Sequence, residues 1–478
     1  MTVPPVRAIG CYRMVRVPLL VLAAAPGAIA CNALIGADDP ILDPVGPPEA
    51  GASAEAGSSV EAGPSAEASD LPDCGAPPPP DDGPVHVLTN GGADEAACGS
   101  HGSPCATIRF ALGQARRASK TVVRVGPGTY REAIDLVPGV TIEGGYFVEK
   151  SGDGYTWIPN CLSKPAPSDG VHIAPDVAMP IVAADLGGTA RLSTLTIHQS
   201  ASPAPSESVY GIFATGATTR LELVDVMIAP ADAGDGLGGA AGASGTVSDA
   251  GCALGDAADA AAPGATGGGA DPGTVDEAGY HPSAGAEGGG GESGENGGAG
   301  QSGACLTCST CNTKCDTGTK RCGGPGAPGC GGGGGGGGAG GSGGGSSIAL
   351  FAWGASVEAT GGSLRSGAGG AGGAGGSGGP GSPGATGPTG SSAISCGIAC
   401  TPLLGCSSYA AAPGGAGSRG GNGTAGGQGG GGAGGWSFAI VSGNDASVDV
   451  PESVLEHSTY GAGGAPGGAP GRSGKRYP

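Results

Sequence analysis

The chain has 478 residues, with 41 acidic against 21 basic residues for a net charge of −20, Gly at 108 positions and aromatic residues at only 4%. So acidic a chain does not attract nucleic acid electrostatically. The abundant Gly and scarce aromatic residues exclude one conventional core along the whole chain, so buried structure is expected only in segments that carry Val, Ile, Leu and Phe.

Residues 1–30 have the pattern of an export signal. Arg7, Arg13 and Arg16 form a positive region, an apolar run follows, and residues 28–30 are Ala-Ile-Ala before Cys31. This pattern is typical of a signal peptide, and the apolar run is too short to span a membrane. Ala-Ile-Ala-Cys resembles a bacterial lipobox, which implies a lipid on Cys31 and a place at the outer membrane on the cell surface. The alternative is an ordinary signal peptide followed by an unrelated Cys.

Residues 31–83 are expected to form a stalk. Glu recurs every sixth residue from Glu49 to Glu67 in units rich in Ala, Ser and Gly, and no Lys or Arg occurs between Arg16 and Arg109. Low hydrophobicity with a single sign of charge cannot offset the entropy lost on ordering, so the stalk is predicted to be disordered. A helix is the alternative, and the frequent Gly and Ser residues argue against it.

Conventional folded structure is expected to begin at residue 84. Apolar residues between 108 and 115 have the spacing of one face of a short helix, and three short apolar runs between 121 and 143 are separated by Gly-Pro turns. Cys98 and Cys105 flank a short polar loop just before the helix. We expect a disulfide between them that fixes the start of this helix.

Three stretches between residues 104 and 146 carry a family resemblance: Pro104-Cys105-Ala106-Thr107-Ile108 with the helix to Ala118, Val125-x-Pro127-Gly128-Thr129-Tyr130-Arg131-Glu132, and Val140-Thr141-Ile142-Glu143-Gly144-Gly145-Tyr146. They resemble the N-terminal cap and first coil of the pectin-lyase-like superfamily. The resemblance implies an all-β fold, a right-handed single-stranded parallel β-helix. The helix would plug its open end, where apolar surface and an unpaired strand edge would otherwise be exposed.

An internal repeat supports the same fold independently of the resemblance. Ile212, Leu350 and Ile440 each begin an apolar run, and a second run follows shortly in each copy. We therefore expect one β-helix domain over residues 84–478, with Gly-rich insertions at about 231–345 and 366–435. Such insertions are tolerated because the entropy of loop closure grows slowly with length. Chance similarity within Gly- and Ala-rich filler is the alternative.

The second insertion has Gly at every third residue from Gly369 to Gly390. This is the period of polyproline II, in which Gly lets neighbouring chains touch. The sequence is compatible with a polyglycine-II-like bundle of adjacent insertions and with plain disorder. A collagen trimer is a weaker alternative, because it needs many more triplets and more Pro.

The densest group of Cys residues lies in the first insertion. Cys305-x2-Cys308-x2-Cys311-x3-Cys315 has the spacing of a ferredoxin-type iron–sulfur site, but Asp316 replaces the usual Pro. In an exported chain we expect disulfides and no metal or other cofactor, with structural zinc as the alternative. The disulfide candidates are Cys98, Cys105, Cys305, Cys308, Cys311, Cys315, Cys322, Cys330, Cys396, Cys400 and Cys406.

The sequence contains no catalytic constellation that we recognise, and we expect that the chain is not an enzyme. Its role is predicted to be that of a cell-surface lipoprotein that displays a β-helix with Gly-rich loops, in a structural, adhesive or glycan-binding role. The expected partners are the membrane, through the lipid anchor, and a surface glycan or another cell-surface component. A carbohydrate-active β-helix enzyme, a lyase or a hydrolase, is the alternative. The acidic and His residues of the folded part share no motif and are expected to be solvated or structural: Asp135, Glu143, Asp225, Glu358, Asp449, His86, His172, His198 and His457.

Overall fold

The computed structural model describes residues 83–160, 170–199, 202–247, 252, 261–307, 320–397 and 408–478. The expected signal peptide, Cys31 and the stalk lie outside the described residues, as do Cys308, Cys311, Cys315, Cys400 and Cys406. Within the described ranges, no helix has both the length and the apolarity needed to cross a membrane.

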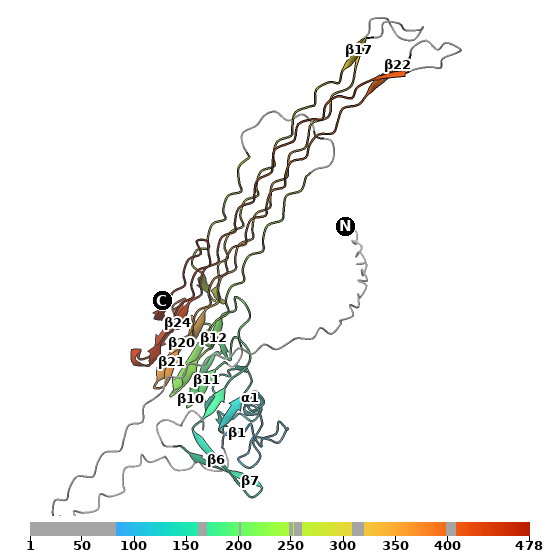
Figure 1. Ribbon diagram of the computed structural model, residues 1–478. Helices are drawn as coiled ribbons and strands as arrows, with labels where there is room; N and C mark the ends of the chain where they lie inside the picture. Colours follow the sequence, from blue (N-terminus) through green and yellow to red (C-terminus); the bar gives the residue numbers. More distant parts are fainter. Residues whose placement is uncertain are drawn as a thin grey trace, which may run out of the picture. The chain divides into compact units, whose positions relative to one another are not determined.

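The strands coil into a right-handed parallel β-helix with three sheets as walls (Figure 1), which confirms the predicted fold class. The seven-stranded sheet contains β1 (Val85–Val87), β2 (Val122–Val125), β5 (Thr141–Glu143), β10 (Gly188–Ser193), β13 (Thr219–Val224), β20 (Ser356–Thr360) and β25 (Ser447–Asp449). The β12 sheet contains β4 (Ile134–Asp135), β9 (Ile181–Ala184), β12 (Val209–Thr215), β19 (Ser347–Trp353), β24 (Ser437–Gly443) and β27 (Ser473–Tyr477). The β14 sheet contains β3 (Gly128–Tyr130), β8 (Val171–Ile173), β11 (Thr196–His198), β14 (Met227–Ala229), β21 (Ser363–Arg365) and β26 (Leu455–Glu456).

The strand register places the internal repeat in consecutive coils. Ile212 pairs with Leu350, and Leu350 pairs with Ile440. The second runs stack in the same way, since Leu221 pairs with Val357 and Val357 pairs with Val448. Because side chains alternate between the two faces of a strand, the matched apolar residues share the inward face and fill one continuous core. Fully buried members of this core are Ile134, Ile142, Ile173, Ile181, Leu192, Ile197 and Ile212.

The N-terminal end of the β-helix is covered by helix α1 (Ile108–Arg117). Its face toward the first coil consists of buried Ile108, Ala111, Leu112 and Ala115. The Glu132 carboxylate accepts the backbone N–H groups of Ile108 and Arg109 at 2.7 and 3.0 Å, and Thr107 caps the same end. A carboxylate is favoured there because the first N–H groups of a helix have no partner within it.

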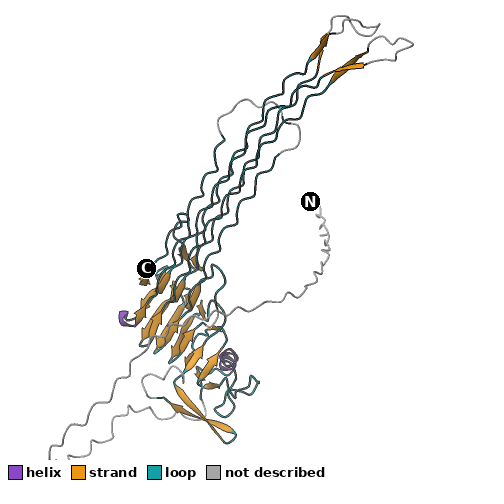
Figure 2. Cartoon of the chain, viewed as in Figure 1, coloured by secondary structure: helices purple, strands orange, loops and turns teal. Residues whose placement is uncertain are grey.

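The Gly-rich stretches form an ordered bundle of extended segments that are neither helix nor strand (Figures 1 and 2). We number them in chain order: first (233–247), second (261–271), third (283–304), fourth (323–345), fifth (367–391), sixth (412–435) and seventh (459–471). Hairpin β15 (Thr274–Asp276)–β16 (Gly279–His281) connects the second and third segments. The pairs β17 (Cys305–Thr307)–β18 (Lys320–Cys322) and β22 (Ala393–Gly397)–β23 (Ser408–Ala411) lie at the distal end.

Backbone hydrogen bonds at every third residue join neighbouring segments. The third and fourth segments are antiparallel, whereas the first and fifth are parallel. This three-residue period is that of polyglycine II. Of the two structures that the sequence left open, the described part of the insertions therefore forms the polyglycine-II-like bundle and is not disordered. Four donors of the first segment, Gly236, Gly239, Gly242 and Gly245, donate to the carbonyl oxygens of Ala371, Ala374, Ser377 and Pro380 at 2.7–2.9 Å.

The fourth segment lies at the centre of the bundle, hydrogen-bonded to the first, third, fifth and sixth segments. A Cβ atom on Gly334 would overlap the carbonyl oxygen of Gly291 in the third segment, and one on Gly335 would overlap that of Gly379 in the fifth. Successive residues thus face different neighbours at backbone contact distance. This packing explains the unbroken Gly run at 331–338.

A second core joins the bundle to the outer face of the β12 sheet. Phe213 and Phe351 stack with ring centroids 4.7 Å apart, and Trp436, which begins the return into β24, is buried beside Tyr280 of β16. The Tyr280 backbone N–H donates to the Tyr210 hydroxyl at 2.8 Å. The hairpin β15–β16 therefore packs against the sheet from which the bundle starts.

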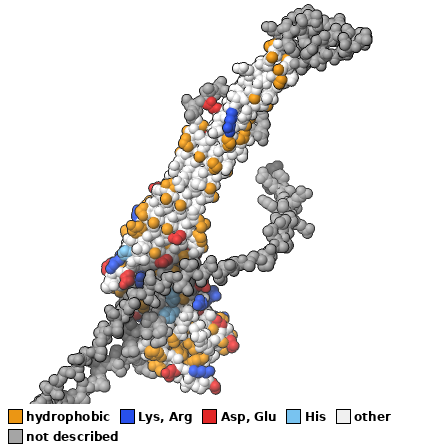
Figure 3. Space-filling view, in the orientation of Figure 1, with side chains coloured by type: hydrophobic (Ala, Val, Ile, Leu, Met, Phe, Trp, Pro, Cys, Tyr) orange, Lys and Arg blue, Asp and Glu red, His pale blue; other side chains and the backbone are white. Residues whose placement is uncertain are grey.

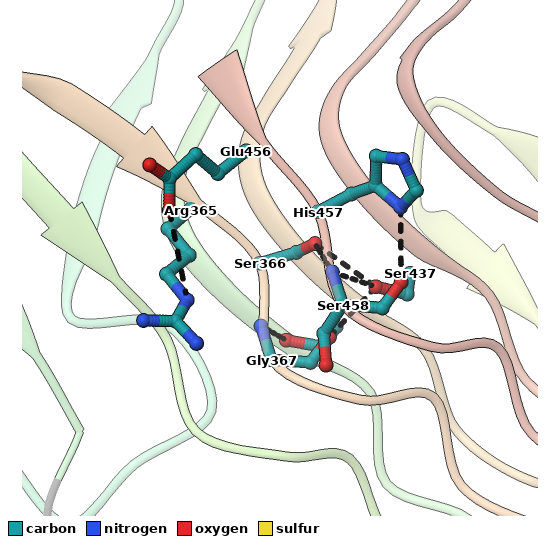
Figure 4. Close-up of polar contacts among 8 residues, drawn as sticks. Arg365, Ser366, Gly367, Ser437, Glu456, His457 and Ser458 are labelled. Carbon is teal, nitrogen blue, oxygen red and sulfur yellow. Dashed lines mark hydrogen bonds and ion pairs between the residues drawn. The ribbon is translucent and has the colours of Figure 1, made fainter. Parts of the chain in front are cut away.

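Buried serines hold the chain where it leaves one sheet for the bundle and returns to another (Figure 4). The hydroxyl oxygens of Ser366 and Ser437 are 3.0 Å apart, and the Ser437 hydroxyl also donates to the Gly367 carbonyl at 2.8 Å. The Ser458 backbone N–H donates to the Ser437 hydroxyl at 3.1 Å. The departure of the fifth segment, the return of the sixth and the departure of the seventh thus meet at one corner.

Candidate functional site

One row on the outer face of the seven-stranded sheet collects carboxylates from three consecutive coils. Glu222 pairs in register with Glu358, and Glu358 pairs with Asp449. On the other side Glu222 pairs with Arg191, whose Nη1 atom is 3.6 Å from the Glu222 Oε2 atom. Both of these side chains are 45% exposed. The row is an open strip of charged groups that a polar ligand can reach.

The sequence analysis named Glu358 and Asp449 but missed Glu222 and Arg191. The signal for Glu222 was present in the repeat, because it follows Leu221 as Glu358 follows Val357 and Asp449 follows Val448. Arg191 could be placed only from the register, since no spacing along the chain relates it to the acidic residues.

The structure does not bring the remaining acidic candidates into this row. Asp135 is exposed on β4, in a different sheet. Glu143 lies 2.8 Å from the Arg124 guanidinium and also accepts the Tyr146 hydroxyl at 3.0 Å. Asp225 occupies the turn between β13 and β14, within one coil, with φ of 52°. Asp and Asn tolerate this left-handed backbone better than most residues, and this tolerance explains why an Asp stands at position 225.

His86 belongs to a packed aromatic cluster under the hairpin β6 (Tyr146–Ser151)–β7 (Gly154–Pro159). Its ring centroid is 4.7 Å from that of Trp157, and the Arg124 guanidinium lies 4.3 Å from the Tyr146 ring centroid. Burial lowers the pKa of His86 to about 4, so this imidazole is neutral at neutral pH. His86, His101 and Lys120 line a pocket of ≈ 300 Å³ beside this cluster.

The other His residues are dispersed over the described chain. His172 and His198 lie on adjacent coils of the β14 sheet with ring centroids 5.6 Å apart. Burial and the neighbouring His172 lower the pKa of His198. His457 lies far along the chain, at the corner where the seventh segment begins, and its Nδ1 atom is 3.0 Å from the Ser458 carbonyl oxygen.

Three disulfides are present among the described Cys residues. One joins Cys98 to Cys105, the pair named from the sequence, with a Cα–Cα distance of 5.0 Å. A second joins Cys305 to Cys322 across the β17–β18 pair, so Cys305 is not a free ligand for a ferredoxin-type cluster. The third joins Cys330 to Cys252. Cys252 was not among the disulfide candidates from the sequence, and no other Cys lies near it in the sequence. The Cys396 side chain lies outside the described part.

Among the described residues, one group of potential metal ligands has close spacing: Asp94, Cys98 and Cys105. The two sulfur atoms are joined in the disulfide. The Asp94 carboxylate accepts the backbone N–H groups of Ala106 and Thr107 at 2.8 and 3.0 Å. These groups are therefore already committed to the start of the capping helix.

The bundle itself is the largest candidate interaction element. Its visible surface consists mostly of backbone and uncharged polar side chains, with scattered hydrophobic side chains and few charged groups (Figure 3). Its far end carries the pairs β17–β18 and β22–β23. The bundle thus holds these two strand pairs away from the β-helix on a framework of backbone hydrogen bonds.

No family model and no curated protein matches the sequence. Among solved structures, the chain is similar to a crystal structure of a pectin methylesterase variant in complex with a hexasaccharide. The two chains are 14% identical, the TM-score is 0.19, and the match covers 33% of this chain and 47% of the other.

This similarity corrects one expectation from the sequence. The absence of a recognised catalytic constellation led to the prediction that the chain is not an enzyme, whereas the matching structure is that of an enzyme. A missing sequence motif is weak evidence, because residues of a β-helix converge through stacking of coils rather than through local spacing. A TM-score of 0.19 assigns no particular activity to this chain.

Proposed function

We propose that this protein is an exported cell-surface lipoprotein that displays its Gly-rich bundle as a projecting structural or adhesive element. The observation that carries the proposal is the ordered bundle, which rises from three coils of one β-helix and carries the strand pairs β17–β18 and β22–β23 at its far end. Loops that only connected strands would not need a hydrogen bond at every third residue.

The contacts at the root of the bundle support a projecting element that is firmly joined to the β-helix. The second core and the serine corner join the bundle to the β12 sheet, and two of the disulfides lie within the Gly-rich stretches. Disulfides are typical of exported proteins, and the lipobox-like sequence before Cys31 is compatible with a membrane anchor. The proposed partners are the membrane and a surface glycan or another cell-surface component.

Proteolysis of intact cells tests the location and the anchor together. A protease that cuts the stalk is expected to release a resistant fragment beginning near residue 83, and metabolic labelling with a fatty-acid analogue is expected to mark the full chain. Cys31→Ser should abolish the label and release the protein from membranes, while Cys98→Ser is the control that keeps the label. A wild-type chain that is unlabelled and protected from the protease would contradict the proposal.

A carbohydrate-active role is the second candidate, and the row of Glu222, Glu358 and Asp449 beside Arg191 favours it. Paired carboxylates are the usual acid–base groups for cleaving glycosidic bonds. The purified chain would be assayed on pectins, uronates and neutral glucans. Activity is expected to fall at least 100-fold in Glu358→Gln and to remain in the control Asp135→Asn. No turnover on any of these substrates would reject this role.

A further inference from the structure

The outer side of the third and fourth segments has a row of backbone donors without partners among the described residues. The N–H groups of Gly334, Gly337 and Gly340 point to no acceptor there. The next N–H in the same row, that of Gly331, donates to the Asn296 side chain at 3.0 Å. The three donors have the same three-residue spacing that joins segments inside the bundle.

The seventh segment shows which kind of chain can dock on such a row of donors. On the fifth segment, Gly369, Gly372 and Gly375 donate to the carbonyl oxygens of Thr459, Ala462 and Ala465 at 2.9, 2.8 and 2.8 Å. The seventh segment thus docks on this row of donors, and the sixth segment adds further hydrogen bonds, since Gly431 and Gly434 donate to the carbonyl oxygens of Pro466 and Ala469. A β-strand would not match it, because its hydrogen-bonding groups repeat every second residue.

The same row of the fifth segment continues past the seventh segment, where the N–H groups of Gly378 and Gly381 have no acceptor among the described residues. Farther along, Gly384 donates to the Asn422 side chain at 3.2 Å, and Arg419 donates to the Gly384 carbonyl at 2.7 Å. On the third segment, Gly290 is exposed, and a Cβ atom there would lie 3.8 Å from its nearest neighbour. Packing within the chain therefore does not require Gly at 290, although Gly costs about 0.5–1 kcal/mol relative to Ala in regular structure.

The first segment has the complementary outer side. Gly238, Ala241 and Ser244 are exposed, their carbonyl oxygens accept no hydrogen bond from the described chain, and a Cβ atom on Gly238 would lie 3.6 Å from its nearest neighbour. The same two segments already pair within the molecule. Three donors of the fourth segment, Ser342, Ala339 and Gly336, donate antiparallel to Leu237, Ala240 and Ala243 of the first at 2.9, 2.9 and 2.7 Å.

We infer that the first segment of a second copy of this chain docks on the outer side of the third and fourth segments. In that pairing Gly340, Gly337 and Gly334 donate to the carbonyl oxygens of Gly238, Ala241 and Ser244 of the partner copy. The interface joins two different surfaces, so a pair of copies keeps one free surface of each kind, one on each copy. Association therefore continues from copy to copy instead of closing as a symmetric dimer.

The net charge of the chain gives association a salt dependence. Each copy has a net charge of −20, so copies repel one another. Association is therefore expected to strengthen as added salt screens this repulsion. The inference concerns the bundle alone and does not depend on membrane anchoring.

Two single substitutions and their mixture test the interface. Sedimentation of the purified chain is expected to show mass rising with concentration. Gly290→Gln and Gly238→Gln each block one surface, so association should require at least ten-fold more protein. An equimolar mixture should form dimers and nothing larger, because each variant keeps the surface that the other lacks. The control is Gly268→Gln, on the second segment, where no atom lies within 4 Å of a Cβ position.

Each outcome of this experiment either supports or overturns the proposed pairing of copies. Dimers in the mixture, with the control behaving as the wild type, support it. A wild type that stays monomeric at high protein concentration and high salt would overturn it. Wild-type association by both blocked variants, or assemblies larger than dimers in the mixture, would overturn it too. Proteolysis of each variant shows that its bundle is intact before the comparison is made.

Discussion

Replacing Gly335 with Ala is expected to disrupt the bundle, although the change adds a single methyl group. The Cβ atom would overlap the carbonyl oxygen of Gly379 and crowd the backbone of Pro380. The extended backbone of the segment suits Ala as well as Gly, so the cost comes from packing alone. Overpacking usually costs about 1–3 kcal/mol, and here the neighbours are backbone that hydrogen bonds hold in place. We therefore expect a loss of about 3 kcal/mol or more.

Thermal unfolding followed by circular dichroism in the polyproline II region measures this effect, with limited proteolysis as a second readout. Gly268→Ala is the matched control, because a Cβ atom there meets nothing within 4 Å. Its stability should stay within about 0.5 kcal/mol of the wild type. Equal melting of the two variants would show that the central segment is not packed as described.

Deleting residues 367–434 is expected to leave a folded β-helix, to remove the fifth and sixth of the seven segments and to loosen the others. The ends of the deletion already lie together, since the hydroxyl oxygens of Ser366 and Ser437 are 3.0 Å apart. Strand β24 can therefore still pair with β19, and the change in loop-closure entropy is small. The fourth segment, in contrast, loses its hydrogen bonds to the fifth and sixth segments.

The measurement combines β-sheet circular dichroism, thermal unfolding and mapping of protease cuts. The strand signal and cooperative unfolding should persist, while cuts appear throughout the remaining Gly-rich segments. A longer deletion, 367–443, removes β24 as well and should abolish cooperative unfolding of the last coils. If the shorter deletion also lost its strand signal, the Gly-rich stretches would be part of the folding core rather than insertions.

Local patterns were sufficient to predict the β-helix. The capping helix follows from apolar residues at helical spacing, and the stacked coils follow from repeats that begin at Ile212, Leu350 and Ile440. In each case the residues that matter are close in sequence or recur in the same order. The register then follows, because the inward face of every coil must be apolar.

The bundle and the charged row could not be predicted in the same way. A segment with Gly at every third residue stays disordered unless other segments lie beside it at hydrogen-bonding distance, and the sequence does not state which segments are neighbours. The Gly run at 331–338 marks the central segment only once four surrounding segments are known. Arg191 meets Glu222 for a similar reason, through the pairing of two coils.

The antiparallel course of the third and fourth segments decides how the bundle resists a pull on its far end. A force on the β17–β18 pair runs along both segments at once. The two chains carry the tension in parallel, and the seven hydrogen bonds from Gly285···Gly341 to Gly303···Gly323 hold them side by side without being pulled open from one end. The Cys305–Cys322 disulfide joins the two chains at the pulled end, so tension there would reach the root of the bundle with little extension.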